Sequence, residues 1–146
     1  MKQIILLFAC LFALQGLAKA DDDRAITVDQ LPQKAQEFIQ KYFPKNEISL
    51  AKMEKDFWEK KYEVVFVNGE KAEFLKDGSW EKVDCKYYST VPTGIVPQAI
   101  KDYVSKHYPE AKILKIERGS KTYEVKLNNQ LELEFNKAFQ LIDIDN

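Results

Sequence analysis

The chain has 146 residues, with 22 basic and 23 acidic side chains and a formal net charge of −1. Lysine and glutamate are scattered without a basic stripe, which argues against a nucleic-acid-binding protein. One histidine and two cysteines, with no H-x-x-x-H pattern or cysteine cluster, predict neither a metal site nor a cofactor site.

The first 20 residues have the layout of a secretory signal peptide. An apolar run follows Lys2, Ala18-Lys19-Ala20 supplies an A-x-A cleavage site, and Asp21–Asp23 follows as a flexible new N-terminus. The apolar run is shorter than the about 20 residues of a comfortable membrane span. We therefore predict cleavage after Ala20 and a periplasmic or secreted mature protein with no membrane segment. Lipidation of Cys10 is the alternative.

One segment of the chain occurs twice. Residues 31–48 match residues 96–113 without a gap, at a constant offset of 65 (96 − 31). Both copies place apolar or amphipathic residues at i, i+4, i+7, i+8 and i+11, which predicts one buried face of a helix of about three turns. These residues are Leu31, Ala35, Phe38, Ile39 and Tyr42, then Val96, Ile100, Tyr103, Val104 and His107. Prolines near both ends bound each helix: Pro32, Pro44, Pro97 and Pro109.

Short alternating runs follow each predicted helix. Strands are expected near 48–55 and 113–117, and then hairpins turn at Asn68-Gly69 and Asn128-Asn129. A further turn at 76–79 leads into another strand. The pattern predicts an α+β fold of two tandem helix-plus-antiparallel-sheet repeats, with the helices packed on one face of a shared sheet. The repeats span 21–85 and 96–146, and residues 86–95 link them.

The matching residues also carry a family resemblance. The first copy reads L-P-x-x-A-x-x-F-I-x-x-Y-F-P over 31–44, Y-E-V recurs at 62–64 and 123–125, and D-G-x-W occupies 77–80. With these motifs the chain resembles the PepSY-like family of exported bacterial proteins, which is similar in fold to beta-lactamase inhibitor protein. The resemblance covers nearly all of the mature chain and implies its fold. The second copy departs from the turn motif at 138–141.

Single residues that could carry chemistry have simpler explanations. Cys85 has no second cysteine in the mature chain and no adjacent histidine, so we predict a packed thiol, with a reactive or dimer-forming thiol as the alternative. His107 is predicted to be a partly buried side chain at the core edge. No nucleophile elbow or phosphate-binding glycine loop occurs, so we predict that the protein is not an enzyme. An enzyme with a dispersed carboxylate site is the alternative.

The two copies differ on the outward face of their hairpins, which suggests a function. Outward positions of the second copy are charged, whereas the first copy has Val65, Val67 and Leu75 there, with Trp58 and Trp80 nearby. Clustered apolar residues on a sheet face are typical of interaction sites. We therefore predict a non-enzymatic binding or inhibitor-like module that contacts a partner protein, or a second copy in a homodimer, through this face.

Two alternatives to the predicted docking face stay open at the level of sequence. In the first alternative, the apolar face is part of the core, because it is covered by the segment 25–28 or by the linker with Tyr87 and Tyr88. In the second, the protein is a periplasmic sensor or carrier that holds a small apolar ligand between the sheet and the helices.

Overall fold

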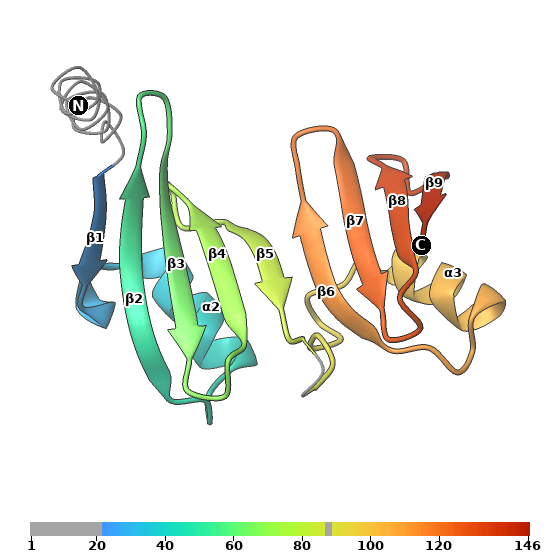
Figure 1. Cartoon of the computed structure of the whole chain (residues 1–146), viewed down its shortest axis with the longest axis horizontal. Coiled ribbons are helices and arrows are strands. Elements are labelled where there is room, and N and C mark those ends of the chain that lie inside the picture. The colour runs from blue at the N-terminus through green and yellow to red at the C-terminus, as the bar shows by residue number, and fades with distance from the viewer. Residues whose placement is uncertain (1–21, 87–88) are drawn as a thin grey trace, which may run out of the picture.

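The computed structural model describes residues 22–86 and 89–146. This part of the chain forms nine strands, two α-helices and one short 3-10 helix (Figure 1). The elements are β1 (Asp22–Ile26), η1 (Val28–Gln30), α2 (Gln33–Tyr42), β2 (Ile48–Lys55), β3 (Lys60–Phe66), β4 (Lys71–Leu75), β5 (Trp80–Asp84), α3 (Gln98–His107), β6 (Ile113–Arg118), β7 (Thr122–Leu127), β8 (Glu132–Asn136) and β9 (Leu141–Asp145).

The strands form one antiparallel sheet whose spatial order is the order of the sequence, from β1 to β9. Four of the hairpin turns contain a residue with positive φ, and Gly69 (φ 90°) occupies such a position in the predicted Asn-Gly turn. The pairing of β5 with β6, which includes Val83 opposite Ile116, continues the sheet across the middle of the chain.

The predicted fold class is therefore wrong. The described chain is mostly one antiparallel nine-stranded sheet with only two short helices of ten residues each, and not two tandem helix-plus-sheet repeats. Two pairings account for the difference. Asp22 and Asp23, expected in a flexible N-terminus, belong to β1, which pairs with β2 from Asp22↔Lys55 to Ile26↔Ala51. Pairing β5 with β6 satisfies backbone groups that two separate sheets would leave exposed at their edges.

The helices form where the sequence predicts them. Pro32 and Pro97 immediately precede α2 and α3, where the fixed φ of proline favours a helix start. The predicted stripe on α2 buries Ala35 and Ile39, and α3 buries Ile100 and Val104. Gly78 (φ 89°) lets the β4–β5 turn approach α2, because a Cβ there would lie 2.9 Å from the Cβ atoms of Pro32 and Lys34.

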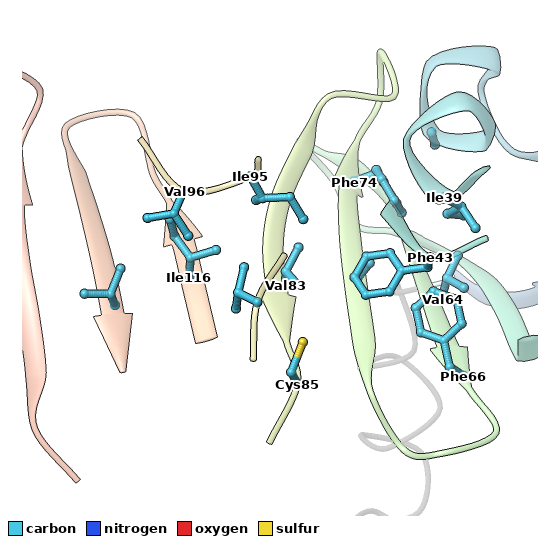
Figure 2. Packing of buried hydrophobic residues seen from close by; sticks show 14 of the residues in the cluster. Ile39, Phe43, Val64, Phe66, Phe74, Val83, Cys85, Ile95, Val96 and Ile116 are labelled. Carbon is cyan, nitrogen blue, oxygen red and sulfur yellow. The ribbon is translucent and has the colours of Figure 1, made fainter. Parts of the chain in front are cut away.

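One face of the sheet forms the core. Laterally paired residues on β2 to β8 are all buried: Ala51, Val64, Ala72, Val83, Ile116, Val125 and Leu133. Phe38 of α2 meets Phe74 at 5.4 Å between ring centroids, and Tyr103 of α3 meets Phe135 at 5.3 Å. Figure 2 shows buried side chains from both halves of the sheet in this core.

The predicted linker 86–95 packs along β6 over its described part. The backbone N–H of Val91 donates to the carbonyl of Ile113 at 2.9 Å, and that of Cys85 donates to the carbonyl of Leu114 at 2.8 Å. Val91 and Ile95 are buried at 3% and 6% exposure. This segment therefore contributes apolar area to the junction between β5 and β6.

Candidate binding surface

The face of the sheet away from the core carries mostly charged residues. The register aligns one row across β2 to β9: Lys52, Glu63, Glu73, Lys82, Glu117, Glu124, Glu134 and Asp143. We call this side the open face. Charges suit it, because side chains on alternate strand positions point away from the apolar core.

Ion pairs organise the β2–β5 part of the open face. The Nζ atom of Lys61 lies 2.9 Å from an oxygen of Glu81 and 3.2 Å from one of Glu59, and the hydrogen bond with Glu81 raises the pKa of Lys61. Lys82 lies 3.7 Å from Glu73. Burial raises the pKa of the Glu73 carboxyl, and Lys82 opposes this effect. These pairs fix the positions of charged groups but contribute little stability, because they are partly exposed.

Two of the predicted binding residues lie near one end of this region. Val65 is half-buried and stands opposite Leu50 of β2, which is 42% exposed. Val67 follows β3 directly and is 63% exposed. Leu50 completes this apolar group, although it was not among the predicted binding residues. Its place in the predicted strand near 48–55 is the sequence feature that could have indicated it.

Leu75 is separate from this group. It is 36% exposed and stands opposite Lys61, whereas Val65 stands opposite Lys71. Lys71 and Leu75 are four residue steps apart, about 13 Å along the strand. The Glu63–Glu73 pair lies between the Val65–Lys71 pair and the Lys61–Leu75 pair. The predicted apolar residues therefore do not form one continuous patch.

Trp58 lies at the tip of the β2–β3 hairpin and is 91% exposed. Its neighbour Phe57 is 80% exposed and was not among the predicted binding residues, although it adjoins Trp58 in the sequence. The Asp56 carboxylate accepts hydrogen bonds from the backbone N–H groups of Trp58 (3.0 Å) and Glu59 (2.7 Å), which lower its pKa. The hairpin thus holds two aromatic side chains in water on an ordered turn.

Trp80 does not share this surface. A bulge between β4 and β5 places it opposite Phe74, on the core side of the sheet. Its ring lies 6.3 Å from that of Phe38, and the Arg118 guanidinium lies 4.3 Å from the Trp80 centroid. Arg118 Nε also donates to the Trp80 carbonyl at 2.8 Å.

The segment 25–28 does not lie across the open face. Ala25 and Ile26 belong to the edge strand β1, and Val28 begins the 3-10 helix. The other segment considered as a cover, Tyr87 and Tyr88, lies outside the described residues. The first alternative to a docking face therefore loses one of its two candidate segments.

A buried polar group adjoins Cys85, which is itself fully buried as predicted. Glu70 is 4% exposed, and its carboxylate accepts hydrogen bonds from Ser89 (2.7 Å) and Asn68 (2.8 Å). Burial raises the pKa of the Cys85 thiol to about 12, and the charge of Glu70 adds to this effect. The thiol is thus protonated at neutral pH and unsuited to nucleophilic chemistry.

His107 is exposed, and the prediction of a partly buried side chain is wrong. It ends α3, and its ring lies 4.3 Å from that of Tyr103 between centroids. Within residues 22–86 and 89–146, no three or more His, Cys, Asp or Glu side chains are grouped so that they could hold a metal ion.

Side chains occupy the space in which a small apolar ligand would lie between α2 and the sheet. Phe38 contacts Phe74 there, and Phe43 stacks on Phe66 at 4.9 Å. A cavity of about 220 Å³ is lined by linker residues, α3 and 111–113. It is smaller than the about 300–1,000 Å³ of typical ligand sites.

Comparisons with known proteins place this fold. The model of the family described as "Putative beta-lactamase-inhibitor-like, PepSY-like" matches residues 60–143. The chain belongs to this PepSY-like family. The match includes the β3–β4 and β7–β8 hairpins, and the first strand of each of these hairpins carries a Y-E-V motif. No curated protein matches the chain.

Three solved structures resemble this PepSY-like protein closely. A "putative periplasmic protein from DUF2874 family" of Bacteroides vulgatus ATCC 8482 is 56% identical, with a TM-score of 0.84, covering 87% of this chain and 99% of that chain. A "putative calcium-regulated periplasmic protein" of Bacteroides thetaiotaomicron is 57% identical, with a TM-score of 0.83 and coverages of 86% and 98%. A "putative periplasmic protein of unknown function" of B. vulgatus ATCC 8482 is 35% identical, with a TM-score of 0.81 and coverages of 86% and 100%.

These neighbours support the predicted periplasmic location. The described part of the chain contains no helix with the length and apolarity to cross a membrane. Cleavage after Ala20 and the alternative at Cys10 concern residues outside the described part, and both stay predictions.

Proposed function

We propose that this PepSY-like protein is an exported, non-enzymatic module that binds a partner protein through the open face of β2–β4 and the β2–β3 hairpin tip. The cross-strand pair Leu50–Val65 carries the proposal. Lys115–Lys126 occupies the corresponding place in the other half, beside the same register shift. Equivalent backbone positions thus hold two lysines in one half and two apolar side chains in the other.

The hairpin tip supplies the second element of this surface. Large aromatic side chains dominate the binding energy of many protein interfaces, because they bury much area with few rotatable bonds. Phe57 and Trp58 are almost fully exposed, and the hydrogen bonds to Asp56 hold their turn before any partner arrives. A preformed turn lowers the entropy cost of binding.

The charged row between the hairpin tip and Val65 is suited to determining which partner binds rather than to increasing the affinity for it. Across four strands the row places two adjacent carboxylates, Glu63 and Glu73, between the ammonium groups of Lys52 and Lys82. A partner must present complementary charges to avoid burying like charges together. Leu75, and opposite it Lys61 with its ion-pair partners Glu59 and Glu81, extend the surface toward the tip of the β2–β3 hairpin.

The experiment is site-specific photo-crosslinking in the periplasm, with the crosslinker at Val67 or, as a control, at the exposed Ser105 of α3. We expect a discrete partner adduct from Val67 and none from Ser105. Phe57→Ala with Trp58→Ala should weaken adduct formation without unfolding the protein, because both side chains project into water.

The double variant Val65→Glu, Val67→Lys tests the same face by charge. We expect it to stay folded by circular dichroism and to lose its partner in a pull-down from periplasmic extract, whereas Glu132→Ala retains it. An unfolded double variant would show that the face is intramolecular core, and an unchanged capture would place the partner elsewhere. Loss of a dimer in gel filtration would identify a second copy as the partner.

A further inference from the structure

The strand β9 forms one edge of the sheet. It pairs with β8 on one side, and no strand of the described chain lies on its other side (Figure 1). An edge strand presents backbone N–H and C=O groups that can pair with an added strand. Backbone pairing of this kind supplies affinity, and the alternating side chains of the edge select the sequence that binds.

The two sides of β9 differ in chemistry. Ile144 stands opposite buried Leu133 on the core side, yet it is 46% exposed, and Leu141 stands opposite Phe135. Asp143 and Asp145 pair with Glu134 and Glu132 on the open face. An added strand would therefore meet apolar side chains on one side of the sheet and carboxylates on the other.

The open face next to β9 is predominantly acidic. Five carboxylates lie on the three strands β7 to β9, and Lys126, opposite Glu132, is the one basic residue on these strands. The five are Glu124, Glu132, Glu134, Asp143 and Asp145. In the described chain, none of the ion pairs closer than 4 Å includes any of the five; these ion pairs all lie on β1–β5 and the turn before β3. Burial and the nearby charges of Glu117, Glu134 and Glu132 raise the pKa of Glu124.

Charge also argues against a second copy as the occupant of this edge. Antiparallel pairing of β9 with itself would bring the acidic rows of two copies together, which is destabilising for directly opposed residues. The other edge strand, β1, carries Asp23 opposite Glu54 on the open face. Joining β9 to β1 of another copy would again place acidic side chains beside one another. Charged side chains on edge strands discourage edge-to-edge association in this way.

We propose that β9 binds an extended segment of a partner protein in which basic side chains alternate with apolar ones, so that the segment adds a tenth, antiparallel strand. Its basic residues would lie beside Asp143 and Asp145, and its apolar residues beside Ile144. This edge is distinct from the surface around Val65, which lies six strands away in the order of the sheet. Either proposal can therefore fail without the other.

The test uses a synthetic peptide with alternating lysine and valine, titrated into the isotope-labelled protein. We expect its NMR amide shifts to change at 141–145 and along β8, with little change on β2–β4. Asp143→Asn with Asp145→Asn should weaken binding about tenfold, the effect of losing two exposed charge contacts. Asp23→Asn on the opposite edge is the matched control and should bind the peptide normally.

Two further peptides separate strand addition from simple charge attraction. N-methylation at every second residue removes N–H donors from one edge of the peptide, so one of the two methylation registers should abolish binding and the other should preserve it. A glutamate–valine peptide should not bind. The proposal is overturned by absence of lysine–valine binding, equal binding of both methylated peptides, shifts confined to β2–β4, or dimerisation through β9 in analytical ultracentrifugation.

Discussion

At the scale of single residues, Cys85 shows how burial determines chemistry. Its thiol is fully buried beside Glu70, which itself is fixed by Ser89 and Asn68. Both the apolar surroundings and the carboxylate disfavour a negatively charged sulfur, so the pKa rises to about 12. The only cysteine in the described chain is thus a packing residue.

We predict that Cys85 reacts slowly with thiol reagents in the native protein. With a pKa of about 12, only about one thiol in ten thousand is ionised at pH 8, and burial also blocks access. Labelling followed by mass spectrometry should become fast in denaturant. Ser105→Cys places a thiol at an exposed site on α3 and should react rapidly, as the control. Fast native labelling of Cys85 would contradict its burial.

The burial of Cys85 could be predicted from sequence, but its polar neighbour could not. Glu70 follows the Asn-Gly turn, where a charged residue normally faces water. It is buried because Ser89 and Asn46, both distant in the chain, come within hydrogen-bond distance of it. Contacts between such separated residues leave no periodic pattern in the sequence.

At the scale of elements, local patterns were sufficient for α2, α3 and the hairpins. Their helical spacing, bounding prolines and turn residues act over a few positions. The inward or outward direction of Trp80 depended on the bulge between β4 and β5, which changes the alternation by one residue. Val65 and Leu75 lie on β3 and β4, whereas the extra residue of the bulge, Glu81, lies on β5, so both face outward as the alternation predicts.

The assignment of faces predicts which truncations destabilise the protein. Phe135→Ala and Phe38→Ala should each lower the free energy of unfolding by about 3–5 kcal/mol, as for large core truncations. Phe135 is fully buried against Tyr103, and Phe38 packs on Phe74. Glu132→Ala should cost little because its side chain is exposed. Urea unfolding measures all three, and equal losses would contradict the strand register.

At the scale of the whole molecule, two pairings that the sequence pattern does not reveal determine the architecture. The edge strand β1 and the β5–β6 junction turn separate helix and hairpin signals into a single nine-stranded sheet. The apolar seam at Val83 and Ile116 has no exposed surface. Edge pairing depends on the partner strand more than on local composition, which explains why the fold class was predicted wrongly.

This continuity predicts one cooperative unfolding transition for both halves. Ile116→Ala at the seam should lower the free energy of unfolding by about 2–5 kcal/mol. It should shift the unfolding midpoints of both halves by the same amount. Fluorescence of the tryptophans reports on the first half, since both precede β6, and amide exchange on β7 and β8 reports on the second. Separate midpoints for the two probes would show that β5–β6 pairing is too weak to couple them.

The order of strands in the sheet also has a consequence for how fast the chain reaches its native state. Paired residues in the hairpins are close in sequence, as with Val64 and Ala72, eight apart (72 − 64). Val83 and Ile116, at the seam, are 33 apart (116 − 83), which adds only about 1 kcal/mol of loop-closure entropy. A sheet in which every strand pairs with its successor has an unusually low contact order for a β-rich protein, and such chains fold quickly. Rapid folding limits the time for which unpaired strand edges are exposed to other chains.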